Sequence, residues 1–247
     1  MKNIRWQIVV GLLLITLSIL LGIVHYEMFH DARTFLFYIV LDIAFVPVQV
    51  LLVTLIISNM LAYREKRAML NKLNMVIGAF FSEVGTRLLK DFSDIDSDMS
   101  KIAEHLKIEN EWTDKKFADV RLLLQRHQYN VVYSAAAFES MQELLIKERG
   151  FLLGLLENQN LLEHESFTDL LWAVFHVTEE LACRTSLQNL PATDTKHLTG
   201  DVRRAYRLLV LQWFDYMKHL KHDYPYLFSL AIRTNPFNPD AKINVMI

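Results

Sequence analysis

The stretch from residue 33 to residue 92 constrains the fold of this chain more than any other. Residues 34–60 read TFLFYIVLDIAFVPVQVLLVTLIISNM, an apolar span long enough to cross the ~30 Å hydrocarbon core of a bilayer at ~1.5 Å per residue of helix. Beyond this span, apolar residues recur at steps of three and four as far as Leu89, and no proline interrupts them. The pattern predicts one long helix that crosses a membrane and continues into water.

A first apolar span, about residues 6–26, precedes the second and forms a transmembrane hairpin with it. Lys2 and Arg5 precede the hairpin and the basic stretch 63–67 (YREKR) follows it, whereas Arg33 is the one Lys or Arg in the loop between. Because basic residues favour the cytoplasmic side, we expect two spans in the inner (plasma) membrane with both termini in the cytoplasm. A cleaved signal peptide is the alternative for the first span, but its apolar region is longer than usual and no Ala-x-Ala-like site follows.

Small and polar residues recur at helical spacing inside both spans. Gly11, Ser18 and Gly22 share one face of the first span, which would let another helix approach closely. Asp42 and Gln49 share one face of the second span. At that depth in the bilayer a carboxyl group costs free energy unless it contacts protein or water. This polar stripe predicts a contact between subunits of a homo-oligomer or an interhelical hydrogen bond; a pore axis is the alternative.

The composition of the remaining chain predicts an all-α fold. After residue 92 roughly 155 of the 247 residues remain, enough for one domain with its own core. Seven glycines and five prolines are few, and alternating Val, Ile and Thr runs are absent outside the spans. The expected organisation is a transmembrane hairpin (1–62), a juxtamembrane helix that continues the second span (63–92), a cytoplasmic helical bundle (93–232) and an irregular tail (233–247).

Within the cytoplasmic part, the apolar periodicity and the capping residues predict four longer helices. The first begins after the cap Thr113, and the second spans residues 135–157. The third begins near Ser166, and the fourth begins at Thr199 or Asp201 and ends before Pro225. Residues 191–200 are expected to be a polar connection.

The single cysteine, Cys183, excludes an internal disulfide and fits a reducing compartment. Because it lies on an apolar-rich helix, we expect it in the core. The net charge of −2 gives no indication of a nucleic-acid partner.

Two groups of histidines and carboxylates have the three- and four-residue spacing that brings ligands together on one helical face. The first is His176, Glu179 and Glu180, and the second is Asp215, His219 and His222 with the neighbouring Asp223. The paired Glu-x-x-His motifs of di-iron bundles are missing, since the run from His176 to Glu179 has the opposite order and occurs once. Ordinary surface histidines and charge pairs are therefore expected, without bound metal.

No catalytic motif identifies an enzyme. GxxxxGK[ST], GxSxG, HExxH and CxxC patterns are all absent, and nothing in the sequence calls for a cofactor. The expected function is that of a membrane-anchored helical protein that mediates contacts with an unidentified cytoplasmic protein and with its own copies. The alternatives are an oligomeric channel formed by the hairpin and a membrane-tethered, metal-dependent enzyme that uses the histidine and carboxylate groups.

Overall fold

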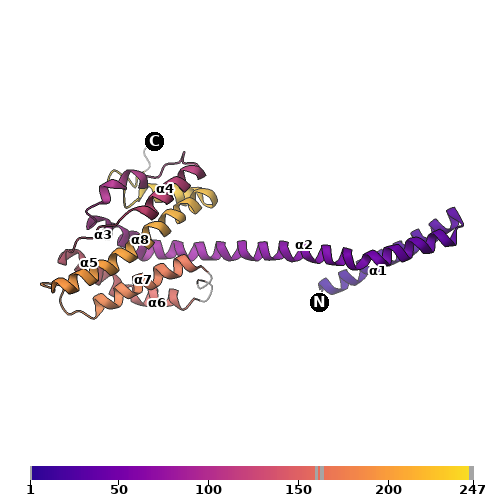
Figure 1. Ribbon diagram of the computed structural model, residues 1–247, viewed down its shortest axis with the longest axis horizontal. Helices are drawn as coiled ribbons and strands as arrows, with labels where there is room; N and C mark the ends of the chain where they lie inside the picture. Colours follow the sequence, from indigo (N-terminus) through magenta and orange to yellow (C-terminus); the bar gives the residue numbers. More distant parts are fainter. Residues whose placement is uncertain (1, 159–160, 162–163, 245–247) are drawn as a thin grey trace. The chain divides into compact units, whose positions relative to one another are not determined.

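The computed structural model describes residues 2–158, 161 and 164–244, and this part of the chain is all-α, as predicted (Figure 1). It contains no strand beyond one isolated bridge between Asp96 and Val131. The chain divides into two compact units, Met1–Lys66 and Arg67–Ile247.

The first unit consists of α1 (Lys2–Phe29) and the first part of α2 (Ala32–Phe80). The turn between them is made by His30, which has a positive φ of 50°, and by Asp31, whose carboxylate accepts hydrogen bonds from the backbone amides of Arg33 and Thr34. This carboxylate satisfies free amides at the start of α2, as a capping residue does. Two stretches, Ile8–Met28 and Ala32–Lys66, are long and apolar enough to cross a membrane.

The second unit is built around α8 (Ala192–Asp223), which packs against α7 (Glu165–Ala182), α4 (Asp114–Arg126), α3 (Thr86–Asp94) and α9 (Pro225–Arg233). The α5 helix (Ala135–Lys147) and α6 (Arg149–Leu156) pack against α7. Short 3₁₀ turns, Met99–Lys101 and Ala103–Leu106, follow α3. Large side chains fill the hydrophobic core, among them the fully buried Phe92, Phe138, Phe167, Tyr206 and Phe214.

A π-helical turn, η1 (Phe81–Gly85), joins α2 to α3, so the predicted long helix is continuous except for this turn. Thr86 stabilises it, because its backbone amide and its hydroxyl both donate to the carbonyl oxygen of Phe81. A π turn of this kind is usually a single inserted turn inside an α-helix.

Three expectations about the second unit were wrong. The segment expected to be a polar connection, 191–200, is helical from Ala192 onward, since Pro191 occupies the position that begins the helix. The helix expected across residues 135–157 is interrupted at Glu148, between α5 and α6. Cys183 is exposed at the carboxyl end of α7 rather than buried in the core.

Candidate functional site

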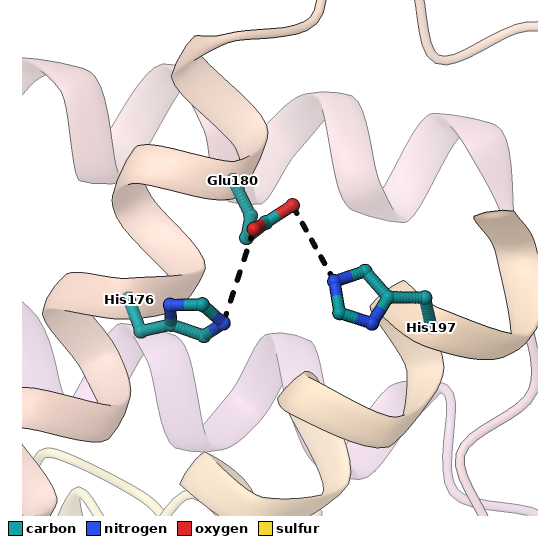
Figure 2. A group of neighbouring side chains, drawn as sticks. All are labelled: His176, Glu180 and His197. Carbon is teal, nitrogen blue, oxygen red and sulfur yellow. Dashed lines mark ion pairs between the residues drawn. The ribbon is translucent and has the colours of Figure 1, made fainter.

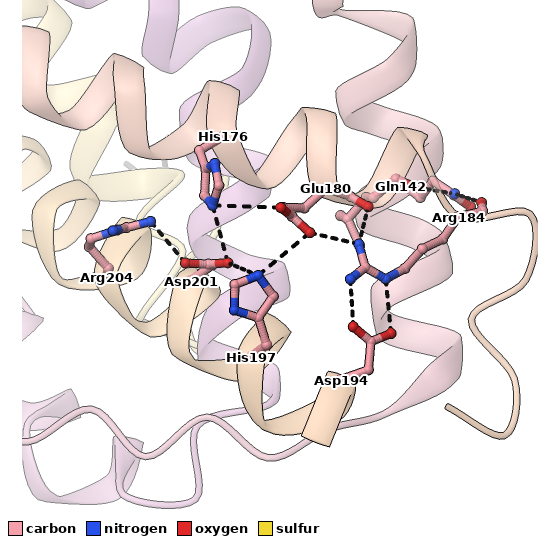
Figure 3. A network of polar contacts seen from close by, with 9 residues as sticks. Gln142, His176, Glu180, Arg184, Asp194, His197, Asp201 and Arg204 are labelled. Carbon is pink, nitrogen blue, oxygen red and sulfur yellow. Dashed lines mark hydrogen bonds and ion pairs between the residues drawn. The ribbon is translucent and has the colours of Figure 1, made fainter. Parts of the chain in front are cut away.

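Two histidines and two carboxylates converge where α7 lies beside α8 (Figures 2 and 3). His176 and Glu180 lie one turn apart on α7, and His197 and Asp201 lie one turn apart on α8. The spacing of four residues places each pair on one face of its helix. Because the two helices are packed together, the two faces meet.

The imidazole nitrogens point at the carboxylate oxygens. His176 Nε2 lies 3.2 Å from Asp201 Oδ2 and 3.9 Å from Glu180 Oε1. His197 Nε2 lies 3.3 Å from Asp201 Oδ2 and 3.6 Å from Glu180 Oε2. Figure 2 shows His176, Glu180 and His197. Each offers one possible ligand atom, and these three atoms lie within 4.8 Å of one another.

The same local pattern builds both halves of this site. Residues 176–180 read HVTEE and residues 197–201 read HLTGD, so each half has a histidine, an apolar residue, a threonine, one variable residue and an acid. The apolar residue and the threonine are buried in both halves, and the hydroxyls of Thr178 and Thr199 donate to carbonyl oxygens one turn earlier. The buried pair fixes each helix against the core, and the histidine and acid are left facing the partner helix.

Arginines hold both carboxylates from the outside (Figure 3). Arg184 Nη1 lies 2.8 Å from Glu180 Oε2, and the same guanidinium contacts both carboxylate oxygens of Asp194, at 2.6 and 3.1 Å. Arg204 Nη2 lies 2.8 Å from Asp201 Oδ1. The hydrogen bond from Arg184 lowers the pKa of Glu180 below its ordinary value, so this carboxyl is ionised at neutral pH.

The cluster opens into a groove of about 920 Å³ along α7 and α8. Besides His176, His197 and Asp201, the groove is lined by an aromatic side chain and three basic ones: Trp172, Arg203, Arg204 and Arg207. Trp172 is 55% exposed. The groove therefore offers a flat aromatic surface, guanidinium donors and a histidine–carboxylate cluster to one ligand.

Of the first group expected from the sequence, the structure brings His176 and Glu180 together but not Glu179. Glu179 accepts a 2.7 Å hydrogen bond from Arg149 instead. His197 and Asp201 were not predicted as site residues, because residues 191–200 were expected to be a connection and Asp201 a possible helix cap. The repeated histidine-threonine-acid pattern is the signal that could have found them.

The second expected group is not assembled. Asp215 makes a two-point ion pair with Arg121, at 2.8 and 3.0 Å. His219 Nδ1 lies 2.8 Å from Asp223 Oδ2, and His222 is exposed. Asp215, His219 and His222 therefore lie in separate contacts and do not share a site, and only His219 and the neighbouring Asp223 are brought together.

In the first unit, three of the residues singled out in the spans are exposed: Ser18, Asp42 and Gln49. A Cβ at Gly22 would lie 3.7 Å from the ring of Phe35 on α2, whereas a Cβ at Gly11 would meet no atom within 4 Å. Of these two glycines, Gly22 is therefore the one that lies next to α2.

Comparison with known proteins gives two family matches that together cover most of the chain. The model described as "MJ1433, N-terminal helical domain" matches residues 2–61, and "Uncharacterized protein MJ1433, C-terminal helical domain" matches residues 69–233. The Uncharacterized protein MJ1433 of Methanocaldococcus jannaschii is 45% identical over 243 residues, which is 98% of either chain. No solved structure matches.

Proposed function

The chain belongs to the family of MJ1433, and on that premise we propose that it anchors a helical, protein-binding domain at the cytoplasmic face of the inner membrane. The observation that carries the anchoring is the exposure of the apolar helices. In the most hydrophobic windows of Ile8–Met28 and Ala32–Lys66 no residue is buried, although both consist almost entirely of apolar side chains. The core helix of a soluble protein would bury most of that surface.

The free energy of hydration supports the same proposal. A fully exposed Leu, Ile, Val or Phe side chain forgoes about 1.5–3 kcal/mol of stabilisation relative to a buried one, and these helices expose such side chains on every face. A helix satisfies its own backbone groups, so hydrocarbon is a suitable solvent for it. The basic residues before the first span and after the second favour a cytoplasmic position for both termini.

Reporter fusions and extraction test the anchor. Fusions at residue 1 and at residue 247 should both report cytoplasm, whereas a fusion in the loop after Phe29 should report the outside. The full chain should also stay in the membrane pellet after alkaline washing. Release by the wash, or an external C-terminus, would overturn the proposal.

The groove along α7 and α8 supports the binding role. Tryptophan and arginine are enriched among the residues that dominate binding free energy at interfaces, and here exposed Trp172 lies in one groove with Arg203 and Arg207. The positive side chains favour an acidic segment of the partner. A photo-crosslinking residue at position 172 should give an adduct with another protein in membranes, and one at the similarly exposed Leu122 should not.

The polar stripe of α2 supports self-association. Asp42 and Gln49 are exposed on this helix, and a polar group in hydrocarbon is costly without a partner. Measured interhelical hydrogen bonds contribute about 0.6–2 kcal/mol, so a second copy would provide a favourable environment. In a Cys183→Ser background, cysteines at 42 or 49 should crosslink between chains, and one at 55 should not. Ion flux in bilayers that Asp42→Leu abolishes would favour the channel instead.

A further inference from the structure

We infer that His176, Glu180 and His197, together with Asp201, form a binding site for one divalent transition-metal ion. The inference does not depend on the proposed anchoring or on any protein partner. It starts from the two pentapeptides, HVTEE on α7 and HLTGD on α8, each of which delivers one imidazole and one carboxylate to the same point. Within the part of the chain that the structure describes, no other group of three His, Cys, Asp or Glu residues meets so closely.

The separations between the ligand atoms fit the size of a metal ion. Bonds of about 2.0–2.1 Å from zinc to nitrogen or oxygen place the ligand atoms of a tetrahedron about 3.3–3.4 Å apart. The histidine nitrogens lie 3.2 and 3.3 Å from Asp201 Oδ2, and 3.9 and 3.6 Å from the nearer Glu180 oxygens. The two Glu180 distances are longer and are made by different oxygens, so the Glu180 side chain would have to turn to bring one oxygen to a shared ion.

The donor atoms select the class of cation. Neutral imidazole nitrogen with carboxylate oxygen suits zinc, iron, nickel and related first-row ions, whereas magnesium and calcium prefer oxygen alone. Two carboxylates balance the charge of a divalent ion. Both histidines face Asp201 with Nε2, the ring nitrogen farther from the backbone, and this orientation would let both rings bind one ion.

The surroundings are those of a supported site. Metal ligands in proteins are held by outer hydrogen bonds that fix their orientation. Arg184 binds Glu180 Oε2, the oxygen that also lies 3.6 Å from His197 Nε2, and Arg204 binds Asp201 Oδ1, whereas Asp201 Oδ2 faces both histidines. The cluster also faces the groove, which gives an ion a path from solvent, since the His176 and His197 side chains are 43% and 54% exposed.

Metal titration of the full chain in detergent tests the inference. After dialysis against a chelator, Zn²⁺ would be followed by calorimetry and Co²⁺ by its visible absorption, which reports coordination geometry. We expect one ion per chain.

Matched variants locate the ion. His197→Ala removes a half-exposed side chain and should weaken Zn²⁺ binding by at least about tenfold. Even loss of a residue that only hydrogen-bonds to a metal ligand lowers metal affinity by about tenfold or more. Glu180→Gln keeps the shape and removes the charge, and should weaken binding similarly. His222→Ala, an exposed histidine on the same helix, should bind as the unmodified chain does.

Circular dichroism would confirm that each variant is folded. The inference is overturned if none of Zn²⁺, Co²⁺ and Mn²⁺ shows saturable binding, in which case the cluster consists of histidine–carboxylate ion pairs only. It is also overturned if binding survives both His197→Ala and Glu180→Gln unchanged. Should His197→Ala fail to fold, Glu180→Gln decides the question by itself.

Discussion

At the scale of single residues, Gly85 lies where two aromatic rings leave no room for a side chain. A Cβ there would come 2.6 Å from Phe81 Cδ1 and 2.9 Å from Phe80 Cε1, and both rings are buried. Gly85→Ala should therefore lower the free energy of unfolding by about 1–3 kcal/mol through overpacking. Gly154→Ala is the control: it adds a methyl group to α6 where no atom lies within 4 Å, and should stabilise by up to about 1 kcal/mol. Denaturant unfolding would measure both, and equal effects would contradict the packing argument.

Two buried imidazoles should make stability depend on pH. Burial lowers the pKa of His127 and of His219, although nearby Asp96 and Asp223 oppose the change. In the unfolded chain both histidines protonate near pH 6.5, so below that pH the unfolded state binds more protons than the folded state. The melting temperature should accordingly fall as the pH is lowered from about 7 to about 5.5.

Two substitutions separate the sources of this dependence. His127→Gln should flatten the profile, because it removes one of the two buried imidazoles. His222→Ala should change the slope much less, since that side chain is exposed and is the smallest of the influences on the pKa of His219. A profile that is flat across this range in the unmodified chain would show that the buried histidines protonate without cost.

At the scale of elements, the start of α4 depends on a side-chain cap. Thr113 Oγ1 accepts a 3.3 Å hydrogen bond from the amide of Lys116, whereas Ser134 precedes α5 and makes no such bond. Thr113→Ala should lower the free energy of unfolding by about 1 kcal/mol, and Ser134→Ala should change it by much less. Thermal unfolding of the two variants side by side measures the difference. A loss as large for Ser134→Ala would contradict the assignment of the cap.

The start of α4 and the start of α8 show what the sequence could predict about elements. Thr113 was identified as a cap correctly. Thr199 and Asp201 were identified as caps wrongly, because threonine and aspartate also serve inside helices. Thr199 donates to backbone carbonyls of the preceding turn, and Asp201 faces His176 and His197. The same error concealed half of the candidate metal site, which only the pairing of α7 with α8 brings together.

At the scale of the whole molecule, the second unit has a hydrophobic core of its own. The buried apolar side chains of the described residues all lie in this unit, from Leu73 to Phe237. A fragment comprising residues 67–247 should therefore fold without detergent and give a helical circular dichroism spectrum. It should also be monomeric, because the polar stripe of α2 is removed. Aggregation relieved only by detergent would contradict the independence of this core.

The all-α class followed from the scarcity of glycine and proline and from the apolar periodicity. Which helices are neighbours did not follow, because the choice between α5, α7 and α8 as partners depends on side chains distant in sequence. Contacts such as the Phe80 ring against Phe167, with centroids 5.5 Å apart, decide that arrangement. Periodicity describes one helix at a time and carries no information about such pairs.

The π turn at Phe81–Gly85 can be understood as a correction of phase. In an uninterrupted α-helix at about 100° per residue, the 19 steps from Leu73 to Phe92 would overshoot five full revolutions by about 100°. That excess is the rotation of one residue, which is what a single inserted π turn absorbs. On this geometry Leu73 and Phe92 are expected on the same side of the helix, and both are buried. Substitutions at the exposed residues Ser82 or Glu83 should therefore be tolerated. Deletion of one residue in this turn should destabilise the fold, since it would rotate the apolar face before the turn away from the apolar face after it.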